Sequence, residues 1–239
     1  MKKRFKAMMF DLDGTLLPMD TPAFMGAYFK ELSLYFANNG YDAEDLMKKM
    51  RNATRAMIFN DGKRCNEDVF WETFFAQMDE AARSKVWDFE PFYNGPFHKL
   101  RSMTGENKKI HETIEAARTC ADHVILATNS VFPPCGIGAR LSWLGLKLSD
   151  FDLVTTYDNS CFSKPNPAYF TEILEKFSAA PEEAFMIGND VEQDALAATT
   201  AGMGAFLITD CIITHDLPYD DYQHGTYNEM LALLKSFSK

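Results

Sequence analysis

The chain has 239 residues, of which 46% are hydrophobic and 24% are charged, a composition typical of a folded protein with a sizeable core. The formal net charge of −10 argues against a nucleic-acid partner, because such a partner favours a basic excess. No apolar run approaches the roughly 20 residues of a membrane-spanning helix, so we expect no membrane partner. The five cysteines are widely spaced and odd in number, which is typical of reduced thiols in a cytoplasmic protein.

The first third of the chain predicts one strand followed by a block of helices. Ala7–Phe10 is a short apolar run that stops at a turn, as a buried strand does. Large apolar side chains then repeat every four residues within Thr21–Asn39, and an asparagine-glycine pair ends this helical pattern. Ala43–Phe59 and Asn66–Met78 are two further helical stretches. Residues 18–92 therefore predict helices and no strand.

Strands and helices alternate through the rest of the chain. The predicted strands are His123–Ala127, Leu153–Thr156, Ala184–Ile187 and Ala205–Ile208. The predicted helices are Lys108–Cys120, Cys135–Leu144, Pro167–Phe177, Val191–Ala201 and Tyr227–Phe237. This alternation indicates an α/β fold in which helices cover both faces of a Rossmann-like parallel sheet. The acidic loop Asp210–Tyr222 carries no interpretable pattern.

The helical block is interpreted as an insertion, because the strand at Ala7–Phe10 would otherwise lack partners. We expect residues 1–17 and 93–239 to form the α/β core domain. We expect residues 18–92 to form a helical cap domain.

Polar clusters stand at or just after the predicted strands. They are Asp11-Leu12-Asp13-Gly14-Thr15, Thr128-Asn129, Lys164-Pro165, and Gly188-Asn189-Asp190 with Asp194 four residues further on. Ligands of an open parallel sheet bind where the carboxyl ends of its strands meet. We therefore expect all four clusters to gather at one edge of the sheet.

The residue types in these clusters suit phosphoryl transfer. Several carboxylates in one crevice repel each other, and a hard cation such as Mg²⁺ relieves the repulsion while keeping water and phosphate oxygens as ligands. Lys164 adds a fixed positive charge, and Thr128 adds a hydroxyl donor. Phosphoryl transfer depends on such positioning and charge neutralisation.

In this order, the four motifs resemble those of the haloacid dehalogenase superfamily of phosphatases, over essentially the whole chain. The resemblance implies that Asp11 is the nucleophile and forms an aspartyl-phosphate. It implies that Asp13 protonates the leaving oxygen and then activates water, with a neighbouring carboxylate raising its pKa. Many relatives carry an aspartate directly after the glycine of the fourth motif, where this chain has Asn189.

The resemblance also implies the ligand sets. Thr128, Asn129 and Lys164 would bind phosphoryl oxygens, although Thr128-Asn129 is also a plausible helix N-cap. Mg²⁺ would be held by the carboxylates of Asp11 and Asp190 and by the backbone carbonyl of Asp13. Asp194 is either a further site carboxylate or a helix-surface residue.

The resulting prediction is a cytoplasmic, Mg²⁺-dependent phosphatase that hydrolyses the phosphate monoester of a small metabolite. A phosphomutase of the same fold is an alternative that the four motifs do not separate from it. A dehalogenase is disfavoured because displacement of halide needs no acid at Asp13. A catalytically silent binding or regulatory module is disfavoured because every motif residue is present. The oligomeric state is not predicted.

Two groups of residues remain outside the motifs. The histidines at 98, 111, 123, 215 and 224 lack zinc-motif spacing, which predicts surface or core roles. The basic residues of the predicted cap either meet an anionic substrate or form solvated helix faces. They are Lys48, Lys49, Arg51, Arg55, Lys63 and Arg64.

Overall fold

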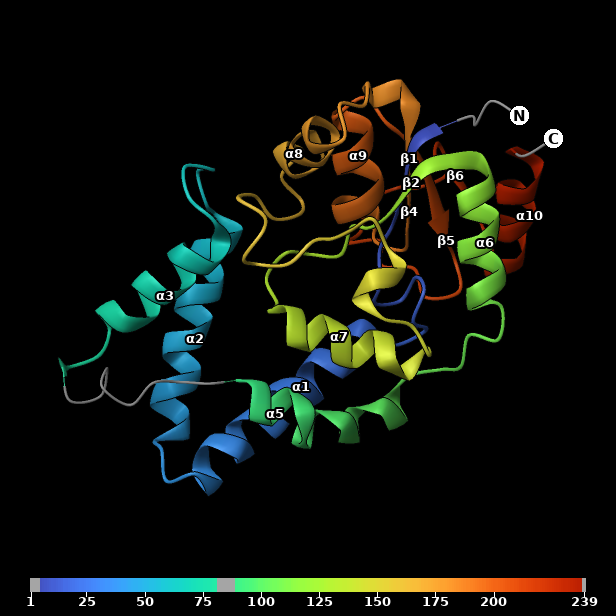
Figure 1. The fold of residues 1–239 in the computed structure, drawn as a ribbon. Helices are drawn as coiled ribbons and strands as arrows, with labels where there is room; N and C mark the ends of the chain where they lie inside the picture. Colours follow the sequence, from blue (N-terminus) through green and yellow to red (C-terminus); the bar gives the residue numbers. More distant parts are fainter. Residues whose placement is uncertain (1–4, 81–88, 238–239) are drawn as a thin grey trace.

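A six-stranded parallel sheet lies at the centre of the computed structural model, which describes residues 5–80 and 89–237 (Figure 1). The strand order is β3-β2-β1-β4-β5-β6. The strands are β1 (Phe5–Phe10), β2 (Ala121–Leu126), β3 (Leu153–Val154), β4 (Ala184–Gly188), β5 (Gly204–Ile208) and β6 (Gln223–Gly225). The five predicted strands are confirmed to within a few residues. The edge strand β6 is absent from the prediction because its Gln-His-Gly sequence has no apolar pattern.

The polar clusters leave the sheet beside the carboxyl end of the central strand β1. Its residues from Ala7 to Phe10 are fully buried, as expected for a strand covered on both faces. Phe10 pairs with Leu126 of β2 on one side and with Ile187 of β4 on the other. The residues that follow these three positions therefore leave the sheet at the same edge.

Helices cover both faces of the sheet (Figure 1). Met8 and Phe10 of β1 face a cluster with helices that include α6 (Ile110–Cys120), α7 (Pro134–Trp143) and α10 (Tyr227–Phe237). Ala7 and Met9 face a cluster that includes α8 (Ala168–Lys176), the π-helical turn η4 (Val191–Leu196) and α9 (Ala197–Thr200). Short 3₁₀ helices, η2 (Leu148–Asp150) and η3 (Pro181–Glu183), precede β3 and β4.

The predicted single α-helix Val191–Ala201 is wrong in detail. The chain instead forms the π-helical turn η4 and then the short α9. The wider first turn accompanies the carboxylate of Asp194, which folds back to accept hydrogen bonds from the backbone amides of Asn189 and Asp190.

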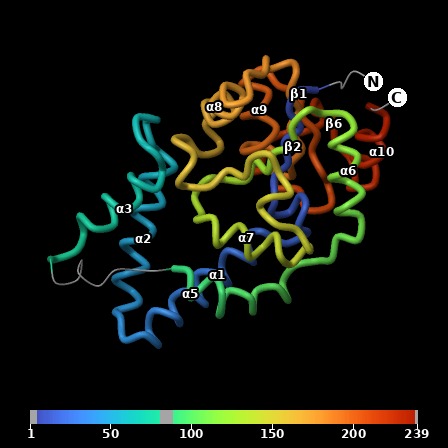
Figure 2. Tube along the Cα trace, viewed as in Figure 1, coloured from blue at the N-terminus to red at the C-terminus, as the bar shows by residue number. Residues whose placement is uncertain are grey.

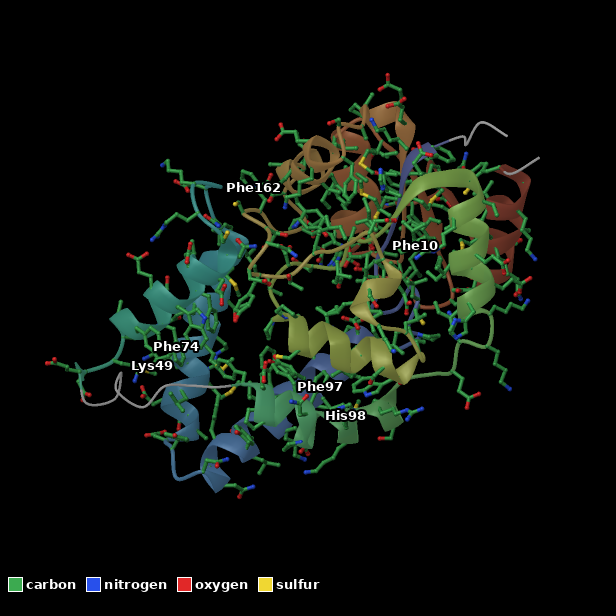
Figure 3. The ribbon with its side chains drawn as sticks, viewed as in Figure 1. Phe10, Lys49, Phe74, Phe97, His98 and Phe162 are labelled. Carbon is green, nitrogen blue, oxygen red and sulfur yellow. The ribbon has the colours of Figure 1, made fainter. Side chains whose placement is uncertain are left out.

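The segment between β1 and β2 is helical, and its described residues between 18 and 92 contain no strand, as predicted. Its described helices before α6 are α1 (Thr21–Asn38), α2 (Ala43–Ile58), α3 (Asn66–Ala76), α5 (Glu90–Asn94) and the 3₁₀ helix η1 (Pro96–Met103). The helices α2 and α3 pack side by side and extend away from the sheet (Figures 1 and 2). Lys49 lies on α2, and Phe74 lies on α3 (Figure 3).

One buried asparagine joins the helical segment to the rest of the molecule. Asn66, which begins α3, is fully buried, and its backbone amide donates to the carbonyl of Ser160 at 2.9 Å. Its Nδ2 lies 3.1 Å from Ser130 Oγ and 3.0 Å from Ser163 Oγ. Phe162 lies against the α2–α3 connection in the same region (Figure 3). These contacts hold the tip of the helical segment beside the carboxyl edge of the sheet.

Three further observations bear on the predictions. The predicted domain ranges include residues 1–4, 81–88 and 238–239, which lie outside the described residues. Within the described residues, no helix is both long enough and apolar enough to cross a membrane. None of the five cysteines, all of which are described, forms a disulfide.

Candidate active site

A crevice of about 330 Å³ opens at the carboxyl edge of the sheet. Its lining includes all seven residues that the motifs single out, brought together from four separate segments of the chain. They are Asp11, Asp13, Thr128, Asn129, Lys164, Asp190 and Asp194. Gathering at this edge follows from the parallel register of β1, β2 and β4.

Lys164 is buried between two carboxylates. Its side chain is 1% exposed, and its Nζ donates to Asp11 Oδ1 at 2.9 Å and to Asp194 Oδ1 at 2.6 Å. Burial alone would lower the pKa of Lys164, but the charges of Asp11 and Asp194 outweigh burial and raise the pKa. The ammonium is therefore a permanent positive charge at the floor of the crevice.

Asp11 directly follows β1 and is a poorly solvated carboxylate. Burial raises its pKa to about 7, although the charge of Lys164 opposes this rise, while Asp194 and Asp13 add to it. Only Oδ1 receives a hydrogen bond, since no described residue donates to Oδ2. Oδ2 is thus the oxygen available to a metal ion or to a reacting phosphorus atom.

Asp194 orients Lys164 instead of lying on a helix surface. Its side chain is buried, and Oδ2 accepts from the backbone amides of Asn189 at 3.1 Å and Asp190 at 3.0 Å. A Cβ at Gly188 would lie 2.1 Å from the same oxygen, so glycine makes room for the carboxylate. Both oxygens of Asp194 are therefore occupied by groups of the protein.

Asp13 is held by an arginine that no motif indicates. Oδ2 of Asp13 accepts a hydrogen bond from Nη1 of Arg140, a fully buried residue of α7. The guanidinium stacks 4.4 Å from the ring centre of Phe132, and its Nε donates to the carbonyl of Gly136 at 3.2 Å. Oδ1 of Asp13 is buried without a partner among the described residues.

The pKa of Asp13 is raised, chiefly by burial. Burial raises the pKa, whereas the charges of Arg140 and Lys164 lower it. Repulsion between the carboxylates of Asp11 and Asp13 contributes to the raised pKa of Asp11, whereas burial is the largest cause for Asp13. Sequence alone carries little signal for Arg140, because an arginine in an amphipathic helix usually faces solvent.

Thr128 and Asn129 leave β2 at the crevice and are fixed by hydrogen bonds. The carbonyl of Thr128 accepts from the hydroxyls of Thr155 at 2.7 Å and Tyr169 at 2.8 Å. Nδ2 of Asn129 donates to Gln193 Oε1 at 2.9 Å and to the carbonyl of Lys164 at 3.3 Å. Oδ1 of Asn129 is buried without a partner among the described residues. These contacts tie the second, third and fourth motifs together.

Asp190 caps the start of η4 and also contacts a histidine. Its Oδ1 accepts from the backbone amides of Glu192 at 3.0 Å and Gln193 at 2.8 Å. His215 Nε2 lies 2.8 Å from Oδ2. Burial raises the pKa of Asp190, while the amide of Gln193 opposes the rise. His215 is exposed, in line with the expected surface role, and it also lines the crevice, which gives part of the loop Asp210–Tyr222 a place in the site.

Asn189, the departure from the family pattern, links the first and fourth motifs. Its Oδ1 accepts from Thr15 Oγ1 at 2.9 Å, and its Nδ2 donates to the carbonyl of Cys211 at 2.7 Å. Gly14, with a φ of +84°, lies so close that a Cβ there would be 2.3 Å from Asn189 Nδ2. Glycine is therefore required both by this contact and by the left-handed backbone.

The oxygen atoms at this edge fit Mg²⁺. Asp11 and Asp190 supply carboxylates in one crevice, and Oδ2 of Asp11 has no donor from a described residue. Oδ2 of Asp190 contacts the side chains of Gln193 at 3.1 Å and His215 at 2.8 Å, so a metal ion there would replace at least one of these contacts. The described residues contain no cluster of three His, Cys, Asp or Glu side chains suited to a metal. The implied set of two carboxylates and the backbone carbonyl of Asp13 needs no such cluster, because Mg²⁺ completes its coordination with water and phosphate oxygens.

Solved structures with this architecture include several hydrolases. A haloacid dehalogenase-type phosphatase from Thermococcus onnurineus superimposes with a TM-score of 0.58 and 24% identity, covering 96% of this chain and 97% of that chain. The magnesium-bound hydrolase YfnB from Bacillus subtilis superimposes with a TM-score of 0.55 and 18% identity, covering 97% and 99%. The 2-haloacid dehalogenase from Pseudomonas syringae has a TM-score of 0.59 and 18% identity, covering 98% and 99%. At these identities the likeness shows the fold.

Sequence comparison gives the same family. The chain is 26% identical to the pyrophosphatase PpaX of Bacillus cereus over 200 residues, which cover 83% of this chain and 81% of that protein. The family model for haloacid dehalogenase-like hydrolases matches residues 5–202, which include every residue of the crevice motifs. This chain therefore belongs to the haloacid dehalogenase-like hydrolase family.

Proposed function

We propose that this hydrolase is a Mg²⁺-dependent phosphatase that cleaves the phosphate monoester of a small metabolite. The observation that carries the proposal is the buried Lys164, which pairs with Oδ1 of Asp11 and leaves Oδ2 facing the crevice without a donor from a described residue. A carboxylate with one oxygen restrained and the other free is oriented as a nucleophile. The similarity to the pyrophosphatase PpaX supports hydrolysis of a phosphorylated substrate, although PpaX is named for a phosphoanhydride and not for a monoester.

In the first step, Oδ2 of Asp11 attacks phosphorus and the bond from phosphorus to the ester oxygen breaks. Lys164, Thr128 and Asn129 line the place where the phosphoryl oxygens would lie, so they bind and orient that group. The departing oxygen takes a proton from Asp13. Oδ2 of Asp13 is engaged by Arg140, so Oδ1, which has no described partner, is the oxygen that carries this proton.

In the second step, the ionised Asp13 accepts a proton from water, and the resulting hydroxide attacks phosphorus. The bond between phosphorus and Asp11 breaks, inorganic phosphate leaves, and both aspartates return to their starting states. Bound through Asp11, Asp190 and the carbonyl of Asp13, Mg²⁺ would neutralise charge on the phosphoryl oxygens. We also propose that residues 18–92 act as a cap that excludes water from the crevice. Five cysteines without a disulfide suit the proposed cytoplasmic location.

The test is phosphate release from p-nitrophenyl phosphate by the purified chain with Mg²⁺. Asp11→Asn should lower kcat at least about a thousandfold, since no nucleophile remains. Asp221→Asn, at an exposed aspartate outside the crevice, is the matched control and should retain full activity. Chelation with EDTA should stop turnover, and added Mg²⁺ should restore it. Turnover by Asp11→Asn near the wild-type rate, or full activity without metal, would refute the proposal.

A further inference from the structure

A second cavity of about 200 Å³ adjoins the crevice. Met25 of α1 and Val131 and Phe132, which follow β2, line both spaces. The remaining walls of the second cavity come largely from α1, α2, α3 and the residues around α5. A molecule whose phosphate lies beside Asp11 can therefore extend directly into this cavity.

The walls of this cavity are mainly aromatic and aliphatic. They include Tyr28, Phe29, Ile58, Phe70, Tyr93 and Tyr157. An apolar protein cavity of about 150 Å³ stays dry and binds benzene, so a cavity of this size admits one aromatic ring. A sugar or another hydroxyl-rich group would leave most of its hydroxyls without partners, because the cavity offers few polar groups beyond its tyrosine hydroxyls, Thr54 and two arginines.

Two arginines of α2 give the cavity a positive margin. Arg51 and Arg55 are four residues apart, so they lie on the same face of the helix, and both line the cavity. Arg55 stacks 5.6 Å from the ring centre of Phe59, and neither arginine has a carboxylate partner among the described residues. Both are exposed, so they remain charged and free to turn toward a ligand.

The other basic residues of the helical segment are placed differently. Lys49 pairs with Asp45, Lys63 pairs with Asp61 at 2.6 Å, and Arg64 pairs with Glu72. Lys48 is exposed and does not line the cavity. Of the six basic residues that the sequence singles out, only Arg51 and Arg55 can meet a ligand that occupies the cavity.

We propose that the second cavity receives the leaving group of the substrate, and that this group is an apolar body of about one aromatic ring carrying an anionic substituent. The inference rests on the proposed phosphatase activity, because it places the phosphate of the same molecule beside Asp11. The ring fills the second cavity, which Phe132 lines, and the anionic substituent pairs with Arg51 and Arg55. The substrate class is therefore an amphipathic organic monophosphate with a second negative charge.

Three phosphate esters of primary alcohols test the inference without changing the chemistry of the leaving oxygen. They are glycerol 1-phosphate, 3-phenylpropyl phosphate and 3-(4-carboxyphenyl)propyl phosphate. We expect kcat/KM to rise at least about tenfold from the first to the second, because the ring enters an apolar pocket. We expect a further rise of about tenfold from the second to the third, because a charge-assisted contact to arginine forms.

Variants separate the two parts of the pocket. In the double variant Arg51→Gln/Arg55→Gln, the tenfold preference for the carboxylated ester over the phenyl ester should fall to about one. Lys48→Gln, on the same helix but outside the cavity, should keep the preference. An unchanged preference in the double variant, or equal kcat/KM for glycerol 1-phosphate and 3-phenylpropyl phosphate in the wild type, overturns the inference and leaves the phosphatase proposal standing.

A binding measurement distinguishes failure of the pocket from failure of the reaction. Calorimetric titration with the alcohol product, 4-(3-hydroxypropyl)benzoate, should show one site in the wild type and at least about tenfold weaker binding in the double variant. Absence of phosphate release from all three esters would refute the proposed function and, with it, the assignment of the cavity to a leaving group. Absence of alcohol binding alongside phosphate release would refute the pocket alone.

Discussion

Replacing Lys164 with methionine should destabilise the fold strongly, because two buried carboxylates then lose their shared counter-ion. The side chain of Lys164 is 1% exposed, and its Nζ lies 2.9 Å from Asp11 Oδ1 and 2.6 Å from Asp194 Oδ1. Removing one partner of a buried ion pair typically costs about 3–5 kcal/mol. We expect Lys164→Met to lower the free energy of unfolding at pH 7 by about that amount.

The loss should grow as the pH rises above 7. The pKa of Asp11 is raised from 3.8 to about 7 by burial, and it would be higher still without the opposing charge of Lys164. A carboxyl whose pKa is higher in the folded chain than in the unfolded chain favours folding at low pH, and this contribution is lost as the pH rises through the folded pKa. Above pH 7 the Asp11 carboxyl of the wild type is ionised and paired with Lys164. In the folded Lys164→Met variant the Asp11 carboxyl lacks this partner and must retain its proton. The extra cost approaches 1.36 kcal/mol for each pH unit, or about 1–2 kcal/mol between pH 7 and pH 8.5.

Urea denaturation of both proteins at pH 6, 7 and 8.5 measures this effect through the transition midpoints and m-values. Lys176→Met is the matched control. Lys176 is 36% exposed and pairs with Glu172 at 2.8 Å across one helical turn, so its loss should cost under about 1 kcal/mol at every pH. A loss below about 1 kcal/mol for Lys164→Met at pH 8.5, or one that does not change between pH 6 and pH 8.5, would show that the lysine is not the counter-ion of these carboxylates.

Three further outcomes are expected. Gly188→Ala should lower the melting temperature, at a cost of about 1–3 kcal/mol or more, because its Cβ would lie 2.1 Å from Asp194 Oδ2. Gly26→Ala, at an open and exposed helical position, should instead raise the free energy of unfolding by up to about 1 kcal/mol and so raise the melting temperature. The opposite ranking of the two variants in a thermal scan would refute the packing argument. Asn66→Ala should cost about 1–3 kcal/mol in urea denaturation, because buried polar groups of both parts of the molecule lose their partner; a neutral effect would contradict the role given to this contact. Mg²⁺ binding at pH 6.5 should release up to about one proton per site, because the ion binds the ionised form of Asp11, whose pKa burial raises to about 7. Calorimetric titrations in two buffers of different ionisation heat count the released protons, and a count of zero would contradict this account.

The position of the crevice can be predicted from the sequence, because the residues that line it follow predicted strands. Asp11, Thr128 and Asp190 stand close behind apolar runs, and parallel pairing alone brings the ends of such runs to one edge. Lys164 is predicted as a site residue only from its place in the order of the motifs, because nothing in the local sequence of a lysine before a proline in a loop indicates burial. Its partner Asp194 remained ambiguous for the same reason, because spacing along a helix does not show whether a carboxylate faces the core or the solvent.

The residues that sequence reasoning missed are those whose role depends on contacts distant in the chain. Arg140 lies 127 positions from Asp13, and nothing in its helix marks it as the largest fully buried side chain. From the sequence, Asn66 is an ordinary polar residue at the start of a helix. Its contacts with Ser130 and Ser163 depend on the fold and leave no sequence pattern. His215 lies in the loop Asp210–Tyr222, whose sequence carries no interpretable pattern, and it contacts Asp190. Hydrophobic periodicity reports the burial of apolar groups, and it carries no information on which polar groups are buried with partners.

The acidic balance of the chain and a phosphorylated substrate are compatible because of where the charges lie. Four carboxylates line the crevice. Among the described residues two buried cations, Lys164 and Arg140, pair with them, and the exposed His215 contacts Asp190. With the four carboxylates and the two buried cations ionised and His215 neutral, the crevice carries an excess of two negative charges, which would repel a phosphate. A single divalent cation balances this excess. The proposed metal therefore does more than assist the reaction, because it turns a crevice that repels anions into one that admits a phosphate. Arg51 and Arg55 extend the same compensation to the far end of the substrate, so a chain with a net charge of −10 can place positive charge at both ends of its proposed ligand.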